Sequence, residues 1–181
     1  LEQKEGYRSG RELRSMDAEK FTKKSLEVIE SCEKLAYEYN NQELTQAHLM
    51  YALVTVEDSL IAKLLTNMGI NMDAFTGECE KLVANRPKVS GGQLFTSPEF
   101  SKALIQAEKE AKQMGDDYIS VEHIFLGLLE KADKDIKRVI NAYGITRGKF
   151  LEVLANIRGN RKVESDNPED YMCRQEFEGL Y

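Results

Sequence analysis

The chain has 181 residues, the size of one ordinary domain, and its 41% hydrophobic and 31% charged residues allow both a core and a solvated surface. Its net charge of −6 argues against general binding to nucleic acid or to anionic membranes, since both require a basic surface. No apolar run approaches the roughly 20 residues that cross a bilayer, and no signal peptide is evident. Three scattered cysteines favour a reducing, cytoplasmic setting over a disulfide framework.

Both ends of the chain are predicted to lie outside the folded domain. Residues 1–15 show no core pattern and precede Met16, so we interpret them as a leader added for expression. Residues 161–181 begin with a polar stretch and are interpreted as a linker and tail. The domain itself is therefore expected over residues 16–160.

The first predicted element is a helix that starts at Thr22, whose hydroxyl can cap free backbone N–H groups. Apolar residues from 26 to 39 follow helical spacing, and Cys32 falls on this stripe, which predicts a core position. No useful segment alternates with a period of two, so the predicted fold class is all-α. Further expected helix starts are Thr45, Asn71, Ser97, Ser120 and Thr146, and expected left-handed helix ends are Gly69, Gly115 and Gly144.

The chain repeats itself at an offset of 75 residues. Residues 45–75 share seven identities with the segment 75 positions later, where average residue frequencies would give roughly two by chance. Each copy is predicted to form four helices, so the expected architecture is a pseudo-twofold domain of two tandem four-helix repeats. Repeat one is assigned to residues 16–86, a connector to 87–96 and repeat two to 97–160.

Two apolar residues, Leu94 and Phe95, lie on the irregular connector, which Gly91 and Gly92 keep from being helical. One interpretation is that both tuck over the seam between the repeats. The other is that they line a partly exposed apolar groove. The sequence favours the first interpretation slightly and leaves the second open.

Catalytic motifs are not evident. The segment from Gly144 to Phe150 has a spacing close to that of a phosphate-binding loop. However, it is one residue short, and Phe150 stands where the magnesium-binding hydroxyl belongs. The carboxylates of the chain are expected to lie mostly on solvated helix faces; examples are Glu108, Glu110, Asp116, Asp117 and Glu122. No catalytic residue, cofactor site or metal site is therefore predicted.

The two histidines occupy equivalent places in the repeats. His48 and His123 each stand three residues after a predicted helix cap, where a side-chain acceptor can bind the N–H group of the cap residue. Equivalent positions in two repeats favour this structural role. A metal-ligand or general-base role is the less favoured alternative, because no zinc-type spacing supports it.

These features together resemble the amino-terminal domain of the Clp unfoldases. The resemblance covers residues 16–170 and is carried by the doubled Thr/Ser-x-x-His motif, by the connector that follows Arg86 and by the Ser97-Pro98 helix start. The connector and residues 163–170 resemble the ClpB disaggregase branch more than the ClpA and ClpC branches. After Asp170 the resemblance stops.

The resemblance implies a parent protein that is a hexameric, ATP-driven chaperone of the stress response, which threads aggregated polypeptide through its pore. ATP and magnesium would bind in ATPase modules that this chain lacks. The resemblance also implies that this domain captures unfolded or aggregated polypeptide in an apolar groove. We therefore expect a cytoplasmic, non-catalytic module that is monomeric in isolation and binds neither nucleic acid nor membrane.

The expected polypeptide-binding residues combine the connector with polar positions implied by the resemblance. Thr22 and Asp116 have alternative structural interpretations, as a helix cap and as a loop-to-helix junction. A carboxylate at position 122 is also favoured by the positive end of a helix dipole. The predicted set is Thr22, Leu94, Phe95, Asp116, Tyr118 and Glu122.

Two rival functions remain open on the sequence. One is docking of a folded adaptor protein, as the resemblance to the protease-linked unfoldases would imply, although the ClpB-like connector disfavours it. The other is a purely structural role in spacing or ordering the hexamer.

Overall fold

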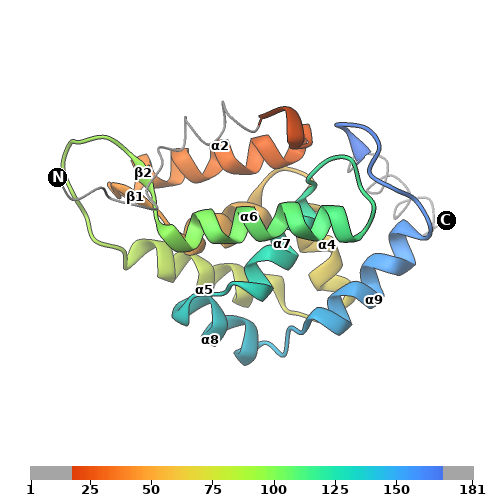
Figure 1. The fold of residues 1–181 in the computed structure, drawn as a ribbon. Coiled ribbons are helices and arrows are strands. Elements are labelled where there is room, and N and C mark those ends of the chain that lie inside the picture. Colours follow the sequence, from red (N-terminus) through yellow and green to blue (C-terminus); the bar gives the residue numbers. More distant parts are fainter. Residues whose placement is uncertain (1–17, 169–181) are drawn as a thin grey trace.

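A computed structural model describes residues 18–168. The predicted leader (1–15) and residues 169–181 of the predicted linker and tail lie outside the described residues. In the first half of the described part are η1 (Ala18–Lys20), α2 (Lys23–Glu38), β1 (Glu43–Leu44), α3 (Gln46–Thr55), α4 (Leu60–Asn67) and α5 (Met72–Ala84). In the second half are β2 (Phe95–Thr96), α6 (Pro98–Gln113), α7 (Val121–Glu130), α8 (Lys134–Ala142) and α9 (Arg147–Arg158) (Figure 1).

The predicted all-α fold with four helices in each half is confirmed. Helix α6 begins and ends 75 residues after α2, and α7 has the same relation to α3. Helices α8 and α9 follow α4 and α5 with bounds that differ from this offset by at most one residue. The offset seen in the sequence is therefore the offset between two copies of one helical unit.

Local side-chain chemistry explains where the helices begin. The Thr22 hydroxyl oxygen accepts a hydrogen bond from the N–H of Ser25 (3.2 Å), and the Ser97 hydroxyl does the same for Phe100 (3.1 Å). The expected left-handed helix ends are present at Gly69, Gly115 and Gly144, with φ angles of 84°, 71° and 66°. The pattern of caps in the sequence therefore predicts six of the eight α-helix starts among residues 18–168, while the caps of α4 and α8, Ser59 and Asp133, were not predicted.

The core runs continuously through both repeats and is centred on α3 and α7. Every residue from Val121 to Leu128 is buried, so α7 is enclosed on all sides rather than amphipathic. Phe125 of α7 packs against Phe150 of α9 with ring centroids 4.5 Å apart. Cys32 is fully buried, as the apolar stripe of α2 predicts.

Two short parallel pairings join the repeats, and the sequence did not predict them. Strand β1 of repeat one pairs with β2, which leads into repeat two. Near the other end of α2, Phe21 forms an isolated parallel bridge with Ile119. The offset of 75 relates Phe21 to Thr96 and Leu44 to Ile119, so the two pairings are copies of one contact. Strands of two residues are too short to show alternation, so the sequence gives no sign of them.

No helix among residues 18–168 is both long enough and apolar enough to cross a membrane.

Candidate functional site

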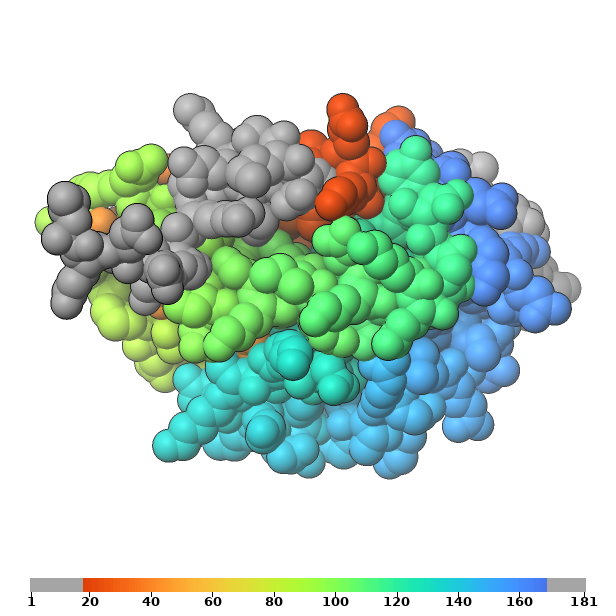
Figure 2. Space-filling view, in the orientation of Figure 1, coloured from red at the N-terminus to blue at the C-terminus, as the bar shows by residue number. Residues whose placement is uncertain are grey.

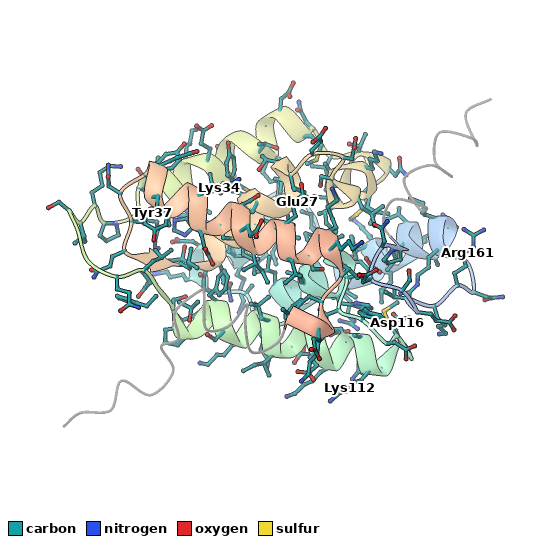
Figure 3. The ribbon with its side chains drawn as sticks, turned by 90° about the horizontal axis from the view of Figure 1, so that it is seen from above. Glu27, Lys34, Tyr37, Lys112, Asp116 and Arg161 are labelled. Carbon is teal, nitrogen blue, oxygen red and sulfur yellow. The ribbon has the colours of Figure 1, made fainter. Side chains whose placement is uncertain are left out.

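The six predicted polypeptide-binding residues fall into two groups at opposite ends of α2. Leu94 and Phe95 lie beside its C-terminal end, where Leu94 shares the lining of a small cavity with Tyr37. Thr22 caps its N-terminal end, close to the segment that runs from Asp116 to Glu122. Figure 3 shows Tyr37 and Asp116 far apart at the two ends of the molecule. We call these places the connector end and the Asp116 end.

At the Asp116 end, a buried carboxylate gathers three donors. One Asp116 oxygen lies 2.7 Å from Nε2 of His123. The other accepts from the Arg158 guanidinium and from the backbone N–H of Val163 (3.0 Å). Burial raises the pKa of Asp116, but the hydrogen bonds from His123, Arg158 and Val163 outweigh it and lower the pKa to about 2. Asp116 is therefore a charged residue fixed inside the fold.

His123 has the predicted capping role. Its Nδ1 accepts a hydrogen bond from the N–H of Ser120 (2.9 Å), so the proton of a neutral imidazole lies on Nε2, which can donate it to Asp116. His48 repeats the arrangement, accepting from Thr45 (3.0 Å) and contacting the Asn41 side-chain oxygen (2.9 Å). The capping interpretation of both histidines is confirmed.

Glu122 completes the group and is the least satisfied of its members. Its carboxylate is fully buried, with one oxygen 3.7 Å from Nη1 of Arg158. Within the part of the chain that the structure describes, neither Glu122 oxygen has a hydrogen-bond partner. Such a carboxylate is costly unless a cation or a donor faces it, and Arg158 supplies the facing charge. We refer to Asp116, Glu122, His123 and Arg158 as the Asp116 cluster.

The expectation that the carboxylates lie on solvated faces is wrong for three of them. Asp116 and Glu122 are buried in the Asp116 cluster, and Glu110 is 2% exposed. Arg147 holds Glu110 with two hydrogen bonds of 2.8 and 2.6 Å and, despite an opposing effect of burial, lowers its pKa. Each buried acid thus lies beside an arginine that is distant in sequence. No local pattern reveals such a partner.

The structure also separates the predicted residues by accessibility. Thr22 and Glu122 are fully buried and Asp116 is 8% exposed, whereas Tyr118 is half-buried. The hydroxyl and the backbone N–H of Thr22 are both used inside the fold, the latter donating to the carbonyl of Ile119 (3.0 Å). The capping interpretation of Thr22 is therefore confirmed.

The connector end is more open. Leu94 is buried, in agreement with the interpretation that it tucks over the seam, while Phe95 is half-buried in β2. Beside them is a cavity of about 100 Å³ lined by Leu94, Tyr37, Val89 and polar groups of the neighbouring turns. Tyr37 is 67% exposed and Val89 43%. Tyr37 and Val89 were not selected from the sequence: Tyr37 lies off the apolar stripe of α2, and Val89 stands in a polar part of the connector.

The described residues offer little chemistry for catalysis. Among residues 18–168, no cluster of His, Cys, Asp or Glu side chains is arranged to hold a metal ion. Burial raises the pKa of Cys79 to about 12 and that of Cys32 further, so neither thiol is a ready nucleophile. What the arrangement can do is bind: it has apolar groups at the connector end and a buried charge cluster at the other.

The fold defines the class, a helical domain built of two repeats. The Clp repeat (R) N-terminal domain family matches residues 20–143. The chain is 39% identical to the chaperone ClpB of Nitratidesulfovibrio vulgaris over 90% of its own length and 38% identical to that of Clostridium tetani over 85%. It spans about a fifth of the length of these relatives.

The fold comparison agrees. The Hsp104 N-terminal domain of Candida albicans superimposes with a TM-score of 0.73 at 20% identity, covering 82% of this chain and 98% of that one. The chain belongs to the Clp repeat N-terminal domain family, the type of domain found in ClpB and Hsp104 chaperones.

Proposed function

We propose that this domain captures unfolded or aggregated polypeptide for a ClpB-type chaperone and carries out no catalytic step itself. The observation that carries the proposal is the connector end, where two exposed apolar side chains, Tyr37 and Val89, lie on the lining of one small cavity. Isolated exposed apolar residues are common, but Tyr37 and Val89 line one cavity together with the buried Leu94, and the half-buried Phe95 follows Leu94 in the chain. The similarity to ClpB chaperones supports the same function.

The energetics suit weak, sequence-tolerant capture. Burial of apolar area stabilises a contact by about 25 cal/mol per Å², so a contact of roughly 200 Å² supplies about 5 kcal/mol before the cost of association. That cost leaves an affinity that is micromolar or poorer. Weak binding allows a captured segment to be passed on.

We also propose a role for the parent protein to which this domain belongs, based on the ClpB relatives. Because the chain spans about a fifth of those relatives, ATP hydrolysis, assembly into a hexamer and threading belong to the sequence beyond this domain. We propose that the domain acts as a monomeric capture module attached to that machinery, in the cytoplasm.

The proposal is tested by titrating carboxymethylated lactalbumin, which stays unfolded, into the full chain while recording backbone amide shifts by NMR. Shifts are expected at Tyr37, Val89 and Phe95. Tyr37→Ser combined with Val89→Ser should weaken binding about tenfold, because it removes most of the exposed apolar contact.

The matched control is Ile105→Ser on α6, which removes an apolar residue of similar exposure (58%) that does not line the cavity. This variant should bind as the unchanged chain does. Equal weakening by Ile105→Ser, or no connector shifts at millimolar lactalbumin, would contradict capture at the connector end. A single folded protein retained at one-to-one stoichiometry would instead favour adaptor docking.

A further inference from the structure

The segment that follows α9 folds back onto the Asp116 end. Residues 160–168, which we call the exit strap, run from the end of α9 to the start of α2 (Figure 1). The backbone of Val163 donates to the Asp116 carboxylate (3.0 Å) and accepts from the N–H of Asp117 (2.9 Å). Farther along, the carbonyl of Asp166 accepts from the N–H of Lys23 (2.8 Å). Figure 2 shows the strap lying against the loop that follows α6.

Few contacts hold the exit strap. Val163, 1% exposed, is its one fully buried side chain, and the residues on either side of Val163 are exposed. A cavity of about 340 Å³ lies against the strap, lined by strap residues and Arg158. Besides Val163 and a few backbone hydrogen bonds, the strap is held by hydrogen bonds of the Lys162 and Arg158 side chains. A segment with so few contacts can open without unfolding the helices beneath it.

The connector makes a related but looser contact on repeat one. Lys88 Nζ donates to the carbonyl of Tyr39 (3.1 Å), and Lys162 Nζ donates to that of Met114 (2.6 Å), which stands 75 residues after Tyr39. A valine follows the lysine in both cases. Val89 is 43% exposed, whereas Val163 is buried. The same Lys-Val contact therefore exists in a loose form on repeat one and in a closed form on repeat two.

The exit strap covers the Asp116 end, where four of the six predicted polypeptide-binding residues lie. It binds Asp116 directly, occupies the N–H of Asp117 beside Tyr118, and pairs with Lys23 next to Thr22. With the strap closed, an incoming chain meets none of these backbone groups. With the strap open, the Asp117 and Lys23 N–H groups and the recess of Val163 fit an extended segment that carries a small aliphatic side chain.

We propose, on the basis of the proposed function, that the exit strap is an intramolecular competitor of polypeptide at the Asp116 end. Closed, it holds the site in the place of a substrate segment; open, it admits one. A polypeptide that binds at the Asp116 end then displaces the exit strap in the same step. Substrate binding would thereby change how firmly the domain is attached to whatever follows residue 168.

A reversible lock tests the proposal. Lys23→Cys and Asp166→Cys introduce two thiols at residues whose backbones are joined by the hydrogen bond from the N–H of Lys23 to the carbonyl of Asp166 (2.8 Å), in the full chain with Cys173→Ser. Cys32 and Cys79 are buried and stay out of the exchange. Lactalbumin is titrated into the oxidised and reduced forms while the amides of Asp117 and Tyr118 are followed. We expect shifts in the reduced form and none in the oxidised form.

The connector end serves as the internal reference. Suppose that the amides of Tyr37 and Val89 shift in both forms, while those of Asp117 and Tyr118 either shift equally in both forms or shift in neither. Competition by the strap is then wrong, and the proposed function stands. If no amide shifts in either form, the proposed function itself fails, and the competition with it. The double variant Lys23→Ser with Asp166→Ser should not respond to oxidation.

A second variant opens the strap instead of locking it. Val163→Ser removes the buried aliphatic group but keeps the backbone hydrogen bonds, so it should speed hydrogen exchange at residues 160–168. It should also tighten lactalbumin binding at Asp117 by about three- to tenfold, because a larger fraction of molecules is open. Faster exchange without tighter binding would overturn the competition.

Discussion

The two repeats differ at one buried polar position, which is Asn41 in the first and Asp116 in the second. Only the second repeat therefore has a charged side chain there. Both side chains contact Nε2 of a capping histidine, at 2.9 and 2.7 Å. Only the aspartate also recruits Arg158 and the strap residue Val163. Asn41 instead donates from Nδ2 to the carbonyl of Pro87 in the connector (3.1 Å). Repeat one therefore holds its following segment through a neutral amide, and repeat two holds its own through an anion.

The residue-scale prediction concerns His48. Burial, helped by the nearby charge of Arg86, lowers the pKa of His48 to about 4 from an ordinary value of 6.5. The unfolded chain therefore takes up a proton before the folded one, and stability is lost as the pH falls from about 6.5 to 4. The loss attributable to His48 should be about 3 kcal/mol in the free energy of unfolding.

Urea denaturation of the unchanged chain and of His48→Gln at pH 7 and pH 4 measures this loss. Glutamine can still accept from the N–H of Thr45, so the cap survives without the titration. The unchanged chain should lose about 3 kcal/mol more than the variant over this range. Parallel losses in the two proteins would show that His48 is not the group responsible.

Sequence reasoning succeeded at residues whose role is local and failed where the partner is distant. The histidine caps and Thr22 depend on groups three residues away, and such spacing is visible in a sequence. Glu110 depends on Arg147, 37 residues further on, and Asp116 on Arg158, 42 residues on. No alternation or motif connects such pairs, so their burial becomes evident only once the helices are assembled.

At the scale of elements, α6 and α7 pack unusually closely. A Cβ atom added at Gly127 would overlap the carbonyl oxygen of Ala103 and lie 3.0 Å from the amide nitrogen of Ala107. Both obstacles are backbone, so neither can rotate away. The equivalent residue in repeat one is Ala52, so the closest approach of helices is a property of repeat two alone.

Gly127→Ala should therefore lower the free energy of unfolding by about 2 kcal/mol or more, because α6 must move to admit the methyl group. Chemical denaturation followed by circular dichroism measures the change. Gly77→Ala on α5 is the matched control: its added Cβ meets nothing within 4 Å, and it should gain about 0.5–1 kcal/mol. Equal effects of the two substitutions would refute close packing as the cause.

The elements themselves were largely predictable. Caps and glycine ends determine helix boundaries through contacts within one turn, and six of the eight α-helix starts in the described part of the chain were found from them; the starts of α4 and α8 were not. The paired strands β1 and β2 were missed, since each strand forms only because a segment about 50 residues away lies alongside it. The accessibility of the candidate site was not predictable either, because it depends on how the exit strap folds back.

At the scale of the whole molecule, neither repeat is complete without the other. Helices α3 and α7 share one continuous core, and Phe21 and Leu44 each pair with a residue of the second half. Residues 16–96 alone should therefore show little cooperative structure, whereas the full chain should unfold in a single transition.

Thermal unfolding followed by circular dichroism checks this prediction, and mixing residues 16–96 with residues 97–168 should restore helical signal. A sharp, reversible transition of residues 16–96 in isolation would show that repeat one folds independently.

The reciprocal pairing of Phe21 with Ile119 and of Leu44 with Thr96 has a consequence for assembly. A protein of half this length with the same contacts would satisfy them by exchanging its leading residues with a twin across a two-fold axis. Its folding would then depend on concentration, whereas joining the twins in one polypeptide removes that dependence. In one polypeptide the two halves can also differ in sequence. Repeat two can therefore carry the charged Asp116 where repeat one has Asn41, whereas a symmetric dimer would carry the same residue in both halves.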